Sequence, residues 1–106
     1  MGIFDYIGGK MQEAGNSIRE AEMEAEGYSA KWICDRLKNT LPLTKLTGYV
    51  NVLKRKAEEL DNFDLKELFE HTQRTRNVKA FNVLAKEMEE RNLVYRDSDG
   101  KVHKNY

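Results

Sequence analysis

Residues 77–104 read NVKAFNVLAKEMEERNLVYRDSDGKVHK, and this stretch decides the fold class. Its first half spaces apolar residues three and four apart, which is typical of one face of an amphipathic helix. Asn77 can cap such a helix, which we expect to end near Arg91. After Asn92 the pattern alternates on either side of a turn signal at Gly100, so the sequence predicts a β-hairpin after the helix.

The two elements of this stretch have predictable inward residues. The hairpin strands are expected at 93–96 and 101–104. Val83 lies off the apolar stripe of the helix and is expected to point away from the core. The stripe itself consists of Val78, Phe81, Leu84, Ala85 and Met88.

The preceding helix has the best-defined start in the chain. Asp64 and Glu67 match a capping box, and Phe63 and Leu68 match the hydrophobic staple that accompanies such a box. We therefore expect a helix from Asp64 to about Gln73. Its inward face carries Leu65, Leu68, Phe69 and Thr72.

Two more helices are expected further upstream. The first covers about 30–40, after a stop at Gly27 and a cap at Ser29, and ends near Pro42, which disfavours helical geometry in the residue before it. The second covers about 44–60. Their apolar faces are, in order, Ala30, Ile33, Cys34, Leu37 and Leu41, then Leu46, Tyr49, Val50, Leu53, Ala57 and Leu60.

The first helix, over residues 4–28, has a heptad pattern. Its apolar residues alternate three and four apart, as in a helix that packs along a narrow seam. Gly8 and Gly15 flank this seam and would let another backbone approach closely. The seam consists of Phe4, Ile7, Met11, Ala14, Ile18, Ala21, Ala25 and Tyr28.

Together these patterns predict a mostly α-helical fold. About five helices form a compact helical bundle with a short C-terminal β-hairpin. We expect one domain over residues 1–106, with a heptad-patterned helix at 1–28, a helical core at 29–91, and the hairpin with the C-terminus at 92–106.

The charges are balanced overall but unevenly spread. The chain has 18 basic and 18 acidic residues, yet residues 1–30 carry six acids against two bases, and residues 31–60 carry seven bases against three acids. The two segments could pair within one fold, or a basic face could stay open for a polyanion. The single cysteine, the lack of a signal peptide and the lack of a membrane span favour a cytoplasmic protein.

No complete catalytic or metal-binding motif is present, so we expect a protein that is not an enzyme and uses no cofactor. Cys34 lies on an inward helical stripe and is expected to be a buried small hydrophobe. Glu67 and His71 are expected to make a local contact one helical turn apart. No small-molecule substrate is evident.

The first functional hypothesis is a protein-interaction module that binds a partner or a second copy through the first helix. The alternative for that helix is ordinary packing on the rest of the bundle. Trp32 lies on a polar helical face, where it either meets another element or anchors a partner. The candidate partner-binding residues are Phe4, Ile7, Met11, Ala14, Ile18, Ala21 and Trp32.

The second hypothesis is a nucleic-acid-binding protein. Residues 44–104 order as three helices and a hairpin, which is compatible with a winged helix-turn-helix in which the fifth helix reads the major groove. Glu87, Glu89, Glu90 and the two aspartates of the hairpin argue against it, as does the neutral chain. The candidate contact residues are Arg74, Arg76, Lys79, Asn82, Lys86, Arg96 and Lys101.

Overall fold

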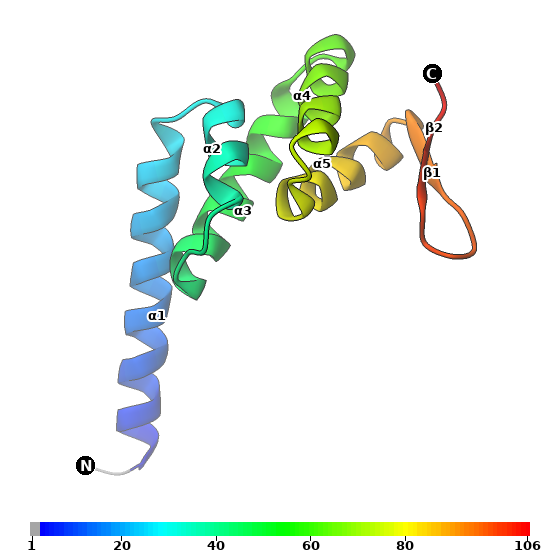
Figure 1. Ribbon diagram of the computed structural model, residues 1–106. Helices are drawn as coiled ribbons and strands as arrows, with labels where there is room; N and C mark the ends of the chain where they lie inside the picture. Colours follow the sequence, from blue (N-terminus) through cyan, green and yellow to red (C-terminus); the bar gives the residue numbers. More distant parts are fainter. Residues whose placement is uncertain (1–2) are drawn as a thin grey trace.

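The computed structural model describes residues 3–106, with side chains from residue 15 onward, and confirms the mostly helical fold with a C-terminal hairpin (Figure 1). The elements are α1 (Ile3–Glu26), α2 (Ala30–Leu37), α3 (Leu43–Glu59), α4 (Asn62–Arg74), α5 (Val78–Glu90), β1 (Val94–Arg96) and β2 (Val102–Lys104). Within that range, no helix combines the length and apolar content needed to cross a membrane.

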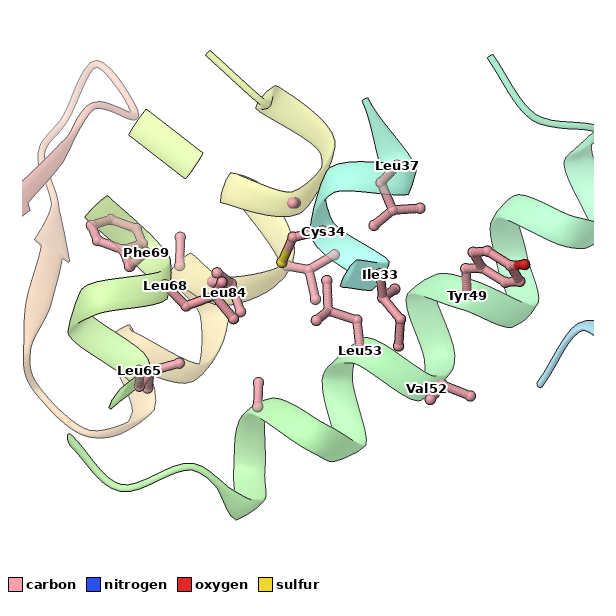
Figure 2. Close-up of a cluster of buried hydrophobic side chains, with 14 of the residues drawn as sticks. Ile33, Cys34, Leu37, Tyr49, Val52, Leu53, Leu65, Leu68, Phe69 and Leu84 are labelled. Carbon is pink, nitrogen blue, oxygen red and sulfur yellow. The ribbon is translucent and has the colours of Figure 1, made fainter. Parts of the chain in front are cut away.

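The core lies where α2, α3, α4 and α5 meet (Figure 2). Its largest members are fully buried and come from all four helices, so this part of the chain packs as one cluster. They include Ile33, Leu37, Tyr49, Leu53, Leu65, Phe69, Leu84 and Met88.

The second half of α1 packs on α3, and the two helices run in the same direction (Figure 1). Gly48 of α3 allows the close approach: a Cβ at this position would lie 2.6 Å from Ala21 Cβ and 2.8 Å from the carbonyl oxygen of Ile18. Ala21 and Ala25 are buried there. The first half of α1 continues past the start of α3 (Figure 1).

The uneven charges pair between α1 and α3. Arg55 binds Glu22 and Glu26 at 3.2 and 2.9 Å, and Lys45 lies 3.7 Å from Glu24. Glu24 also accepts a hydrogen bond of 2.7 Å from the hydroxyl of Tyr49. These acidic residues of α1 and basic residues of α3 therefore pair within the fold, the first of the two alternatives for the uneven charges.

Two of the expected helix caps are confirmed. Ser29 Oγ accepts from the backbone N–H of Trp32 at 3.1 Å, and Asn77 Oδ1 accepts from that of Ala80 at 3.3 Å. Both helices begin directly after these residues.

The expected start of α4 is wrong. Asp61 caps the helix by accepting from the backbone N–H of Asp64 at 2.7 Å, so Asp64 is the third helical residue. Two acids stand three apart, and the extended backbone at Leu60 lets the earlier one take the cap. Phe63, the expected staple, is consequently 69% exposed, whereas Leu65 is buried.

Helix α2 ends earlier than expected. Its last residue is Leu37, and Lys38 is its C-cap. Asn39 and Thr40 have low helix propensity, so the chain leaves the helix before Pro42 forces it to. Residues 38–42 form a loop, and Pro42 is the N-cap residue of α3.

The inward face of α5 is wider than its apolar stripe. Ala80 and Val83 are buried, and Val78 is 67% exposed, so the expectations for Val78 and Val83 were both wrong. Helix α5 touches α2, α3, α4 and β1, and contacts on several sides bury more than one stripe. Val78 lies outside that arc, in the first turn of the helix.

The hairpin forms where the sequence predicts it, with its turn at Gly100. Tyr95 pairs with His103 across the strands, and their rings stack with centroids 5.0 Å apart. Gly100 has a φ of 82°, which favours glycine. Asp97 Oδ1 closes the turn by accepting from the backbone N–H groups of Asp99 and Lys101.

Candidate nucleic-acid interface

The turn between α4 and α5 fixes the position of α5. Its backbone changes direction at Arg76, which has a φ of 53° where a glycine is more usual. Asn77 is buried; besides capping α5, its Nδ2 donates to the carbonyl oxygen of Cys34 at 2.5 Å. The first turn of α5 is therefore tied directly to α2.

The outer face of α5 is polar and basic. Lys79, Asn82 and Lys86 stand three and four residues apart, so they share one side of the helix, and all three are exposed. Arg76 is exposed just before this face. Amide and ammonium groups in this arrangement can reach base edges and phosphates.

These basic side chains have no acidic partner. Among residues 15–106, no carboxylate oxygen lies within 4.0 Å of the cationic nitrogens of Arg76, Lys79 or Lys86. Lys79 Nζ donates to the backbone carbonyl of Asn39 at 3.3 Å, which leaves its charge uncompensated. The face is therefore positively charged.

The glutamates that follow on α5 are mostly engaged. Glu87 pairs with Arg91 at 2.9 Å, and Glu89 pairs with Arg96 of β1. Only Glu90 of this group has no cationic partner in the described chain. These ion pairs weaken the sequence-based objection to an anionic ligand.

Most charged side chains of the hairpin pair with other parts of the chain. Arg96 also donates to the carbonyl oxygen of Gly100 at 3.3 Å, and Lys104 binds Glu70 of α4 at 2.9 Å. The bond from Lys104 lowers the pKa of the Glu70 carboxyl. Lys101 is exposed, so it is the most available of the hairpin cations.

Asp97 is held by its own hairpin. Its Oδ2 lies 2.6 Å from His103 Nε2. The bond to His103, followed by the backbone N–H groups of Lys101 and Asp99, lowers the pKa of the Asp97 carboxyl.

Arg74 is separated from the α5 face. It lines an open cleft of about 500 Å³ between α4 and the start of α2. Glu67, Glu70 and His71 line the same cleft. The structure therefore groups four of the seven predicted contact residues, Arg76, Lys79, Asn82 and Lys86, and places Arg74, Arg96 and Lys101 elsewhere.

Cys34, His71 and Tyr49 each have contacts inside the fold. Cys34 is buried as expected, and burial, followed by the nearby charge of Asp35, raises the pKa of its thiol to about 12. His71 does not bind Glu67, because it lies on the side of α4 that faces α2, where its Nε2 is 2.8 Å from Asp35 Oδ1. Burial, followed by the hydrogen bond to Glu24, raises the pKa of the Tyr49 hydroxyl to about 12.

The predicted partner-binding residues fall into three groups. Ala21 is buried under α3, and Ile18 is half-buried beside it. Trp32 is 39% exposed; it stacks on Tyr28 of the preceding loop with ring centroids 3.7 Å apart, and its ring lies 6.3 Å from that of Tyr49 in α3. Phe4, Ile7, Met11 and Ala14 lie outside the residues whose side chains are described.

The sequence pattern does not indicate a loop at residues 38–40, because it predicts a helix over about 30–40. The structure puts this loop beside the first turn of α5, through the bond from Lys79 to Asn39. The available signal was the polar Lys38-Asn39-Thr40 run before Pro42.

No family model, curated protein or solved structure matches this chain.

Proposed function

We propose that this chain binds double-stranded nucleic acid in the manner of a winged helix, with α5 as the helix that enters the major groove. The observation that carries the proposal is the outer face of α5, where Lys79, Asn82 and Lys86 are exposed and the two lysines have no carboxylate partner among residues 15–106. An uncompensated cationic face on a single helix suits a phosphate-lined groove.

The dimensions support this assignment. Helix α5 has 13 residues. At about 1.5 Å per residue it is roughly 20 Å long. The major groove is about 12 Å wide and admits one helix. Lys79 and Lys86 would contact phosphates, Asn82 between them could reach a base edge, and Lys101 would contact the backbone from the hairpin.

The test is binding to a labelled DNA duplex across a salt series. We expect Lys79→Ala and Lys86→Ala each to weaken binding and to reduce the slope of log affinity against log salt by about one unit. Lys54→Ala is the matched control, because Lys54 is an exposed lysine of α3 outside this face. Equal binding by all three variants and the unchanged chain would contradict the proposal.

A second candidate is a protein-interaction module that self-associates or binds a partner helix through α1. Its support is the heptad pattern, which continues from the buried positions Ala21 and Ala25 toward the N-terminus, past the start of α3 (Figure 1). A helix that extends beyond its intramolecular partner can pack along the same seam with another chain.

The mass in solution tests this second candidate. We expect a dimer that Met11→Asp converts to a monomer, because the substitution puts a charge into the seam. Met23→Asp is the control, since Met23 lies on the exposed side of α1. A monomer at all concentrations would rule out self-association.

Both candidates describe a binding protein of the cytoplasm and not an enzyme. The support for that compartment is the buried Cys34, a thiol that has no second cysteine to pair with in the sequence.

A further inference from the structure

The loop between α2 and α3, residues 38–42, lies against the start of α5. Lys79 Nζ donates to the carbonyl oxygen of Asn39 at 3.3 Å, and Asn77 Nδ2 donates to that of Cys34 at 2.5 Å. Two side chains from the first residues of α5 and its cap therefore hold the C-terminal end of α2. The bond from Lys79 links the loop to the α5 face.

The end of a helix normally repels anions, because its last carbonyl groups point outward with a partial negative charge. At the end of α2, the carbonyl oxygen of Cys34 accepts from Asn77, and those of Asp35 and Arg36 accept from the backbone N–H groups of Lys38 and Asn39. Asp35, the nearest acid in sequence, lies 2.8 Å from His71 Nε2. Three of the last four carbonyls of α2 and the carboxylate of Asp35 therefore have hydrogen-bond partners.

Lys38 adds a positive charge at the same place. It is the C-cap of α2, its side chain is exposed, and no carboxylate among residues 15–106 pairs with it. Asn39 and Thr40 beside it are also exposed and can donate hydrogen bonds. The loop thus has the groups that contact phosphate oxygens.

We infer that the α2–α3 loop is a second nucleic-acid contact, in which Lys38 binds the phosphate backbone that flanks the groove occupied by α5. The inference rests on the proposed nucleic-acid binding and extends that surface across the end of α2, on the side of α5 away from the hairpin. Lys38 follows α2 and lies outside α5, the helix that enters the groove, so it contacts the backbone and not a base. It therefore contributes affinity without sequence preference.

The expected size of the effect follows from counterion release. Removing one phosphate contact lowers the slope of log affinity against log salt by about 0.9. At 0.1 M salt this corresponds to about eightfold weaker binding if affinity at 1 M salt is unchanged. Lys38→Ala should show this loss with duplexes of unrelated sequence alike.

The experiment uses the full chain and a fluorescently labelled 20-base-pair duplex, with anisotropy measured at several salt concentrations. Lys38→Ala is compared with Lys54→Ala, which removes an identical charge from α3, and with Lys79→Ala on α5. Thermal melting of each variant checks that the fold is retained. The single strand of the same sequence is titrated in parallel.

The outcomes separate this inference from the proposed function. If Lys79→Ala weakens binding and Lys38→Ala behaves like Lys54→Ala, the loop contact is wrong and the role of α5 stands. If the unchanged chain binds no duplex, or binds the single strand equally well, both are overturned. A loss for Lys38→Ala of similar size to that for Lys79→Ala, on the duplex only, supports the loop contact.

Discussion

The buried side chain of Asn77 makes two structural hydrogen bonds. Its Oδ1 caps α5, and its Nδ2 holds the carbonyl oxygen of Cys34 in α2. An aspartate at this position could still cap the helix but has no N–H to donate. It would also bring a carboxylate against a carbonyl oxygen in a site that is almost fully closed to water.

We therefore expect Asn77→Asp to lower the free energy of unfolding by about 2–3 kcal/mol, because it leaves a buried acceptor unsatisfied. Chemical denaturation measures the change. Asn82→Asp, an identical substitution at an exposed position of the same helix, should change stability by less than about 0.5 kcal/mol. Equal losses for the two variants would show that the bond to α2 contributes nothing.

Arg91 connects the ends of three helices. Its guanidinium donates to the carbonyl oxygens of Ala57 and Glu58 at the end of α3, to Asn62 Oδ1 at the start of α4, and to Glu87 in α5. The planar guanidinium has several N–H donors and can bond to all four groups at once, whereas the single ammonium group of lysine cannot.

Arg91→Lys should lower the free energy of unfolding by about 2 kcal/mol, because several charge-assisted hydrogen bonds are lost while the charge is kept. Thermal melting with a fixed buffer provides the measurement. Arg74→Lys is the control, since Arg74 is exposed and has no carboxylate partner in the described chain. Unchanged stability in Arg91→Lys would contradict a connecting role.

At the scale of elements, periodicity predicts which segments are helical, and packing decides their details. The hairpin and the caps at Ser29 and Asn77 follow from local residue types, so they were predictable. The cap of α4 was not, because Asp61 and Asp64 are both suitable and only the surrounding backbone selects one. The burial of Val83 depends on neighbours on several sides of α5, which the sequence of one helix does not contain.

Gly15 of α1 and Gly48 of α3 should respond oppositely to an added methyl group. Gly48→Ala should destabilise the fold by about 1–3 kcal/mol, because the new Cβ would overlap the backbone of α1. Gly15→Ala meets nothing within 4 Å and should stabilise α1 by about 0.5–1 kcal/mol through helix propensity. Denaturation curves test both. A gain in stability for Gly48→Ala would mean that α1 does not pack so closely on α3.

The hairpin should lose stability in acid. The pKa of Asp97 is below its ordinary value in the folded state, so its contribution is present above the ordinary carboxyl pKa and disappears as the pH falls through the folded pKa. An NMR titration of hairpin amides follows this loss. Asp97→Asn should remove the transition, whereas Asp99→Asn, at the exposed tip, should keep it. A transition that persists in Asp97→Asn would assign it to another group.

At the scale of the whole molecule, α1 makes the structure elongated. The radius of gyration is 16.3 Å and the extents are 59 × 33 × 23 Å. A chain of this length folded into a sphere-like domain has a radius of gyration of about 13 Å. Small-angle scattering of the monomer should give a value near 16 Å, as in this structure. A value near 13 Å would mean that α1 folds back on the bundle in solution.

The candidate interface was partly predictable at this scale. Lys79, Asn82 and Lys86 could be placed on one helical face from spacing alone, and the structure groups them. Arg74 and Arg96 could not be separated from that group by sequence, because their positions depend on the cleft beside α2 and on the ion pair with Glu89. The position of Lys38 in a loop could not be predicted, because the sequence pattern extends the helix to about residue 40 and α2 ends at Leu37.

The contact between α1 and α3 also determines which helix unfolds locally first. Ala21 and Ala25 are the buried residues that α1 contributes to the described core. Its polar links to α3 are surface ion pairs, each worth little, and hydrogen bonds from Tyr49 and Lys56. Helix α5 contributes five buried residues and contacts elements on several sides. Backbone amides in the second half of α1 should therefore exchange with solvent deuterium well before those of α5, so that α1 can detach while α2–α5 remain folded.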